Sequence, residues 1–201
     1  MTDWIDQITS AWCGHRKFAE FLVDHYKDPI VVELGVDYGF STFVFANALN
    51  ETNGKIYGID LFLGDIHTGY RNTYDSVINN ISEHNLKNIE IIVGDFTEIS
   101  NKWETPIDIL HIDGLHTYDA VKNDFNNWNK YLKDDGVIIF HDVSVPYFGV
   151  KHFFKEVTYG FKLYFIHSAG LGICTKNQIL YNKILENFDN VYDDITCPFT
   201  D

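Results

Sequence analysis

The stretch DILHIDGLHTYDAVKNDF, residues 108–125, decides the fold of this chain. Its apolar run stops at Asp113, and a helix-like segment follows at once. A second apolar run, GVIIFHD (136–142), ends in the same way on His141 and Asp142. Strands that lead directly into helices are typical of a parallel sheet with right-handed crossovers. Because the carboxyl ends of parallel strands meet at one edge, we expect both His/Asp ends in one site.

The alternation of strand and helix continues on both sides of this stretch. We expect five strands, at residues 29–34, 54–60, 89–95, 107–113 and 136–142. We expect helices at residues 8–26, 41–49, 74–86, 118–132 and 148–157. Two further strands, 161–167 and 171–176, are joined by a short turn and are expected to pair antiparallel. The pattern predicts an α/β fold whose mostly parallel sheet carries helices on both faces.

The length of the chain and its uniform composition predict one domain. It has 201 residues, enough for a substantial core, and no repeat or linker divides it. We expect an N-terminal helical segment over residues 1–28, a core over 29–176 and a C-terminal tail over 177–201.

The net charge limits the kinds of partner that this chain is expected to bind. It has 15 basic and 29 acidic residues, which gives a formal net charge of −14. So acidic a chain is expected to bind neither nucleic acid without sequence preference nor an anionic membrane surface. No apolar run is long enough to span a bilayer. A homo-oligomer is left open by the composition.

The cysteines and the N-terminus indicate a cytoplasmic protein. Cys13, Cys174 and Cys197 are odd in number and far apart, which does not suit a disulfide framework or a zinc site. The first residues, MTDWIDQITS, lack the basic and apolar regions of a signal peptide.

The first strand runs into a glycine-bearing loop, VVELGVDYGFST (31–42). Gly35 and Gly39 permit a tight turn and a close approach to a ligand. Asp37 stands where the GxGxxG fingerprint has its middle glycine, which counts against a pyrophosphate ligand. Glu33 and Asp37 suit a cationic cofactor without phosphate. A plain strand-to-helix turn, capped by a hydroxyl of residue 41 or 42, explains the loop equally well.

Acidic residues also end the second and third strands. Asp60 lies at the position where this topology usually has the carboxylate that binds the ribose hydroxyls. The alternative is a carboxylate that only faces solvent. Asp95 could accept from an adenine amino group while Phe96 packs on the ring, and the alternative for Asp95 is a helix N-cap. Together with Glu33 and Gly35 they form a series at successive strand ends, which is more specific than any one member.

These residues resemble a known family. The sequence is similar to class I S-adenosylmethionine-dependent methyltransferases, and more narrowly to the methyltransferase 24 family with its macrocin-type and sugar O-methyltransferases. The resemblance runs from about Ile30 to Thr175. It is carried by the segments VVELGVDYGFST (31–42), YGIDLFLGDIHTG (57–69), DILHIDGLHTYDAVKNDFNNW (108–128) and GVIIFHD (136–142). It implies a Rossmann-like sheet of seven strands with the last strand antiparallel.

The resemblance also implies the cofactor, S-adenosyl-L-methionine, and its contacts. The positions that match the expected cofactor contacts are Glu33, Gly35, Asp37, Gly39, Ser41, Asp60, Leu61, Asp95, Phe96 and Asp113.

Metal and base candidates follow from the two acidic strand ends. Asp113 and Asp142 suit Mg²⁺, as in catechol-type and macrocin-type relatives. His141 lies where such enzymes place another acid, and it either shifts the preference towards Mn²⁺ or binds no metal. His116 holds the spacing of the catechol-type general base, and its imidazole is suited to accept a proton near neutral pH. His67, in the loop after the second strand, is the second candidate base.

Other polar residues receive plainer interpretations. His111 lies inside an apolar strand and is expected in the core or behind the site. Asp119 and Asp124 are expected to be solvated or to interact with a helix dipole. Asp65 and Arg71 share a loop with His67 that either covers the cofactor or is only a surface loop.

The hypothesis is therefore an O-methyltransferase with a histidine base, assisted by a divalent metal, and the family resemblance favours a sugar or glycan acceptor. A metal-independent N- or O-methyltransferase of another small molecule is one alternative. A nicotinamide-dependent oxidoreductase on a similar sheet is a second, although the broken glycine fingerprint argues against it. A noncatalytic cofactor-binding module is a third.

Overall fold

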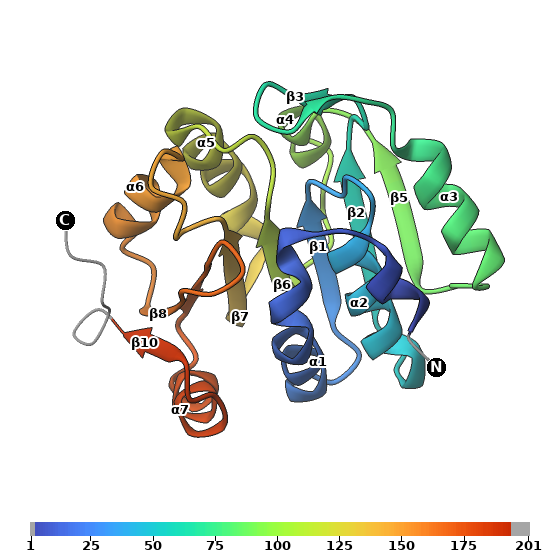
Figure 1. The fold of residues 1–201 in the computed structure, drawn as a ribbon. Coiled ribbons are helices and arrows are strands. Elements are labelled where there is room, and N and C mark those ends of the chain that lie inside the picture. Colours follow the sequence, from blue (N-terminus) through green and yellow to red (C-terminus); the bar gives the residue numbers. More distant parts are fainter. Residues whose placement is uncertain (1–2, 194–201) are drawn as a thin grey trace.

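A central eight-stranded sheet organises the protein. The structure is a computed structural model and describes residues 3–193 (Figure 1). The strand order is β10-β8-β9-β7-β6-β1-β2-β5. The bounds are β1 Ile30–Leu34, β2 Lys55–Asp60, β5 Ile89–Val93, β6 Ile107–Ile112, β7 Leu132–His141, β8 Phe161–Phe165, β9 Leu171–Thr175 and β10 Val191–Asp193. The α/β fold with a mostly parallel sheet is confirmed.

Five neighbouring strands of the sheet are parallel, and the pairings beyond β7 are all antiparallel. Strands β5, β2, β1, β6 and β7 are parallel neighbours. Strand β9 then lies antiparallel between β7 and β8, as expected for the last strand of a seven-stranded sheet. Strand β10 pairs antiparallel with β8 and adds an eighth strand within the segment expected as a tail. The rest of that segment, residues 194–201 with Cys197, lies outside the described residues.

Helices cover both faces. One face carries α1 (Arg16–His25), α2 (Phe40–Ala48), α3 (Tyr74–Glu83) and α7 (Gln178–Asn187), and the other carries α4 (Phe96–Ser100), α5 (Tyr118–Trp128) and α6 (Gly149–Glu156). Alternate residues of a strand serve opposite faces: Val31 packs with the first group and Val32 with the second. The central strands are buried on both sides, and their sequences are accordingly apolar almost throughout.

The start of α2 differs from the expectation. Neither Ser41 nor Thr42 caps the helix; the N-cap is Gly39, with φ at 86°. Both hydroxyls instead donate to the buried carboxylate of Glu33. The cap prediction was wrong because a buried carboxylate without donors would cost more than an uncapped helix end.

The loop after β2 is also more ordered than a plain loop. Strands β3 (Gly64–Asp65) and β4 (Gly69–Tyr70) pair antiparallel and form a small hairpin. It lies above the carboxyl ends of the strands (Figure 1). None of the helices within residues 3–193 is long and apolar enough to cross a bilayer.

Candidate active site

A cavity of about 620 Å³ opens at the carboxyl ends of the parallel strands. This volume is in the range of cofactor sites. The cavity-lining residues that sequence analysis singled out are Gly35, Asp37, Ser41, Asp60, Leu61, Asp65, Asp95, Phe96, Asp113, His116, Asp124, His141 and Asp142. Three other candidates, Glu33, Gly39 and His67, are not among the lining residues.

Gly35 lets two strand ends approach each other. Its φ is 98°, and a Cβ at this position would lie 2.1 Å from the carbonyl oxygen of Asp113. Any side chain here would push the end of β6 away from the end of β1. The first glycine therefore shapes the floor of the cavity as well as the turn.

Asp60 holds the first loop in place. One of its carboxylate oxygens accepts from the backbone N–H groups of Val36 at 2.7 Å and Asp37 at 2.9 Å. The other accepts from the backbone N–H of Phe62 at 2.7 Å. Asp60 also lines the cavity, so the carboxylate expected to bind ribose is already fixed by the protein.

Asp95 is the helix N-cap, one of the two roles that the sequence left open, and it also lies at the cavity. Its side chain caps α4 by accepting from the N–H groups of Thr97 and Glu98, and it lines the cavity beside Phe96. Asp37 also lines the cavity, but its carboxylate forms a bidentate ion pair with the guanidinium of Arg71. That guanidinium offsets the attraction of Asp37 for a cationic ligand.

Glu33 lies below the cavity and not in its wall. Its side chain is fully buried and accepts from Ser41, Thr42 and, at 2.9 Å, His111 Nδ1. The indole N–H of Trp12 donates to His111 Nε2 at 3.1 Å, so this nitrogen is unprotonated and Nδ1 carries the proton. We call Glu33, Ser41, Thr42, His111 and Trp12 the closed network, because every polar group in it has a partner.

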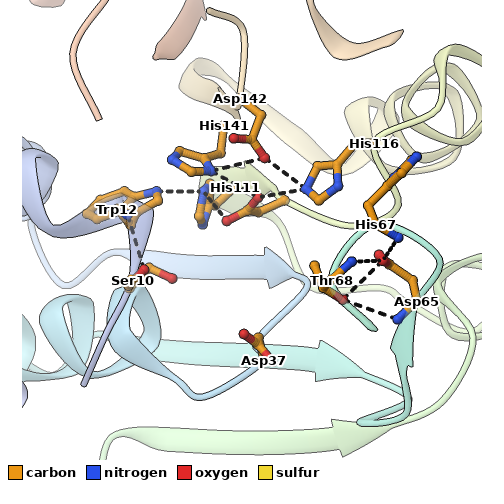
Figure 2. A network of polar contacts seen from close by, with 12 residues as sticks. Ser10, Trp12, Asp37, Asp65, His67, Thr68, His111, His116, His141 and Asp142 are labelled. Carbon is orange, nitrogen blue, oxygen red and sulfur yellow. Dashed lines mark hydrogen bonds and ion pairs between the residues drawn. The ribbon is translucent and has the colours of Figure 1, made fainter. Parts of the chain in front are cut away.

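A second set of acids and histidines lies at the ends of β6 and β7 (Figure 2). His116 Nε2 lies 2.8 Å from Asp142 Oδ2, and His141 Nδ1 lies 3.2 Å from Asp113 Oδ1. We call Asp113, His116, His141 and Asp142 the edge cluster. His111 contributes little to it, because its Nε2 lies 3.9 Å from Asp113 and is held by Trp12.

The edge cluster shifts the pKa values of its members. Burial raises the pKa of Asp113, but His141 and His116 outweigh it and hold that pKa well below its usual range. Burial lowers the pKa of His116, whereas Asp113 and Asp142 raise it to about 9. The same two carboxylates raise the pKa of His141 to about 10 against its burial. Without a bound cation, the cluster is two ion pairs.

Asp142 adopts a conformation that is uncommon for a residue with a side chain. Its φ is 64°, in the left-handed region. Such strain persists where the surroundings over-determine the backbone, and it often accompanies a functional site. Here it accompanies the carboxylate that contacts both His116 and His141.

The donor set of the edge cluster suits a divalent cation. Asp113, His141 and Asp142 each offer a ligand atom, and these atoms lie within 4.8 Å of one another. Two carboxylates with one imidazole match Mn²⁺ or Mg²⁺ with water completing the shell. The structure therefore brings together the three residues expected at a metal.

His116 is oriented by its neighbours. Its ring stacks on Phe148, with centroids 4.4 Å apart and an interplanar angle of 7°. Because Nε2 faces Asp142, Nδ1 is the nitrogen left over, and it is buried without a hydrogen-bond partner. His67, the second candidate base, is exposed and lies against both rings.

Sequence reasoning missed Asp124. It was expected to be solvated or to interact with a helix dipole, yet it is 5% exposed and lines the cavity. Burial raises the pKa of Asp124 to about 7, and Asp95 adds to the effect. Its helical spacing with Val121 and Trp128, both buried, is the signal that places it on the inner side of α5.

The N-terminal segment was also not expected at the site. Thr9, Ser10 and Ala11 line the cavity, directly before Trp12 of the closed network. Figure 2 shows Ser10 and Trp12 on the side of the site opposite the hairpin.

Comparisons with known proteins agree with this architecture. A family model described as a methyltransferase domain, methyltransferase 24, matches residues 32–143. An uncharacterized protein of Sinorhizobium fredii is 33% identical over 156 residues, which are 74% of this chain and 17% of the relative. The chain thus matches only a small part of that relative's length.

Solved structures share the fold. An O-methyltransferase of Bacillus cereus in complex with SAH has a TM-score of 0.61 at 19% identity, covering 80% of this chain and 79% of that one. The O-methyltransferase TomG of Streptomyces achromogenes, involved in tomaymycin synthesis and in complex with SAM, has 0.59 at 16%, covering 86% and 89%. An rRNA methylase of Streptococcus thermophilus has 0.59 at 17%, covering 81% and 95%. With more than half of its residues matched by the family model, the chain belongs to the methyltransferase 24 domain family.

Proposed function

We propose that this protein is an S-adenosylmethionine-dependent O-methyltransferase that uses His116 as its general base. The observation that carries the proposal is the pair formed by His116 and Asp142. The 2.8 Å contact to Nε2 leaves Nδ1 as the nitrogen that accepts a proton when the imidazole is neutral, and the raised pKa of His116 moves that neutral state to alkaline pH as long as no cation offsets the two carboxylates. A carboxylate that fixes the tautomer of a histidine base is a recurrent catalytic arrangement.

The cavity supports S-adenosylmethionine as the methyl donor. Asp60 meets the ribose hydroxyls, and Asp95 with Phe96 meets the adenine, since all three line the cavity at successive strand ends. Glu33 acts indirectly, by fixing Ser41, which does line the cavity. Methyl transfer then joins the acceptor oxygen to the methyl carbon while the carbon–sulfur bond breaks. The leaving group is S-adenosylhomocysteine, and the hydroxyl proton goes to His116 Nδ1.

Asp113, His141 and Asp142 would hold the divalent metal, which when bound lowers the pKa of the acceptor hydroxyl. The residues themselves then orient His116, because Asp142 contacts both imidazoles of the cluster. The buried position of His116 limits competition by water for its free nitrogen.

A sugar or glycan hydroxyl is the proposed acceptor. The family membership supports it, and the surface beside His116 is compatible with it. Tyr147, 82% exposed, follows the end of β7 and packs edge-to-face with Phe148, whose ring stacks on His116. Aromatic side chains with one apolar face and one polar handle suit a ligand that is partly apolar.

Calorimetric titration with S-adenosylhomocysteine, with and without Mn²⁺ or Mg²⁺, tests the proposal. We expect micromolar binding, weakened in Asp60→Ala, together with a metal-binding heat that Asp113→Ala/Asp142→Ala abolishes. Glu104→Ala, an exposed acid outside the cavity, is the matched control. No cofactor binding in the folded wild type would refute the proposal. Cofactor binding without a metal heat would favour the metal-independent alternative.

A further inference from the structure

A second group of ligand-type side chains lies beside the edge cluster. Asp65 and His67 belong to the β3–β4 hairpin, and His116 lies just before α5. One ligand atom from each lies within 4.8 Å of the other two. Figure 2 shows the His116 ring between Asp142 on one side and Asp65 and His67 on the other. We call these three residues the hairpin triad.

Asp65 keeps one carboxylate oxygen available. Its Oδ1 accepts from the N–H groups of His67 and Thr68, both at 2.7 Å, and from the Thr68 hydroxyl at 3.0 Å. No hydrogen bond reaches its Oδ2 from any residue that the structure describes. The turn therefore fixes the carboxylate through one oxygen and presents the other.

His116 presents a nitrogen in the same direction. The residue is 8% exposed, and its Nδ1 is buried without a partner. A buried polar atom without a partner is unusual in a native protein and asks for an explanation. The contact of the opposite nitrogen with Asp142 is the carboxylate–histidine arrangement that orients metal-binding imidazoles.

His67 completes the group. Its backbone N–H donates to Asp65, while neither ring nitrogen takes part in a hydrogen bond within residues 3–193. Its ring centroid lies 5.5 Å from that of His116 and 5.0 Å from that of Phe148. Three ligand atoms without hydrogen-bond partners among the described residues thus converge from two elements that are far apart in sequence.

We propose that the hairpin triad is a second metal site, for Zn²⁺ or a similar borderline divalent ion, distinct from the edge cluster. Two imidazoles and one carboxylate with a fourth position for water are a common zinc-ligand set. Ligand atoms of a tetrahedral zinc lie roughly 3.4 Å apart, as follows from bonds of about 2.1 Å. Because the present atoms lie within 4.8 Å of one another, the exposed hairpin would have to close by at most about 1.4 Å.

Occupancy would have two consequences. The ion would tie the hairpin to the start of α5, and hairpin residues Gly64, Asp65 and Thr68 line the cofactor cavity. It would also take the lone pair of His116 Nδ1, so zinc would inhibit methyl transfer. Only this second consequence rests on the proposed function.

The test is a titration of the full chain with Zn²⁺ by calorimetry, repeated with Co²⁺ by visible absorbance. We expect His67→Ala and Asp65→Asn to weaken binding at this site at least tenfold. His152→Ala, an exposed histidine of α6, is the matched control and should bind as wild type does. His141→Ala removes a ligand of the edge cluster only and should also keep this site.

Each outcome separates the two proposals. Unchanged zinc affinity in both hairpin variants overturns the second site, and a loss confined to His141→Ala places the ion in the edge cluster. Zinc binding that needs His67, without binding of S-adenosylhomocysteine, keeps the second site and removes the proposed function. If the ion connects the hairpin to the start of α5, zinc should slow amide hydrogen exchange at residues 63–71 in the wild type and not in His67→Ala.

Discussion

The closed network and the edge cluster are built from the same residue types and behave in opposite ways. Both place acids and histidines at the ends of neighbouring strands. In the closed network, Glu33 has three donors and both nitrogens of His111 are engaged. In the edge cluster, His116 keeps a buried nitrogen without a partner, and Asp142 is backbone-strained. We infer from this difference that the closed network stabilises the fold, whereas the edge cluster is the part proposed to take part in chemistry.

The largest expected effect is on stability, from Glu33→Ala in the closed network. The change leaves the Nδ1–H of His111 and two hydroxyls buried without an acceptor. We expect the free energy of unfolding to fall by about 3–5 kcal/mol, the range for breaking a buried charged network. Urea denaturation measures it. Glu51→Ala, an exposed acid, should change it by less than about 0.5 kcal/mol. A similar small change for Glu33 would mean that the network contributes no stability.

Asp124→Asn is expected to have the next largest effect, with the opposite sign. The folded pKa of about 7 exceeds the ordinary 3.8, so the folded state binds more protons and stability falls as pH rises between these values. The ionised carboxylate therefore costs stability above pH 7, by at most about 4 kcal/mol. The variant should be more stable than wild type at pH 8 and equal to it near pH 3.5. Parallel denaturation curves at both pH values check this, and an equal difference at both would contradict it.

Trp12→Phe tests the hydrogen bond by which the N-terminal segment joins the closed network. It removes the N–H donor of His111 Nε2 while keeping most of the apolar volume. We expect a loss of about 1–2 kcal/mol in unfolding free energy, from the acceptor left without a partner. Trp4→Phe, at a partly buried position, serves as the control. If the two variants lose equal stability, the hydrogen bond to His111 is not the cause.

The smallest effect is expected for His116→Ala on cofactor affinity. Its unpaired nitrogen faces the hairpin, so S-adenosylhomocysteine should bind within about threefold of wild type, while methyl transfer is lost. Calorimetry provides the affinity and a methyl-transfer assay the activity. Lost cofactor binding in a folded variant would count against the base assignment.

The direction of the strands could be predicted from the sequence, because apolar runs joined by helical segments favour a parallel sheet and two runs joined by a short turn favour antiparallel pairing. The additional strand β10 and hairpin β3–β4 could not, since pieces of two or three residues carry no periodic signal. They are fixed by pairing with elements already in place.

The site was predictable in outline and not in detail. Acids at successive strand ends share an edge in any parallel sheet, which is why Asp60, Asp95 and Asp113 converge. The side chain of Glu33 could not be placed, because a strand buried on both faces shows no alternation to orient it. Asp124 was misread because helical position was weighed less than charge.

The hydrogen bond from Trp12 to His111 also has a consequence for folding. The two residues are 99 positions apart in the sequence, so the contact must close a long loop. The family model begins at residue 32, after this segment. We expect the sheet to assemble before the N-terminus docks, so the cavity wall at residues 9–11 would be the last part to form. In that step the indole of Trp12 moves from water into a dry environment. Its fluorescence would therefore report when the site is complete.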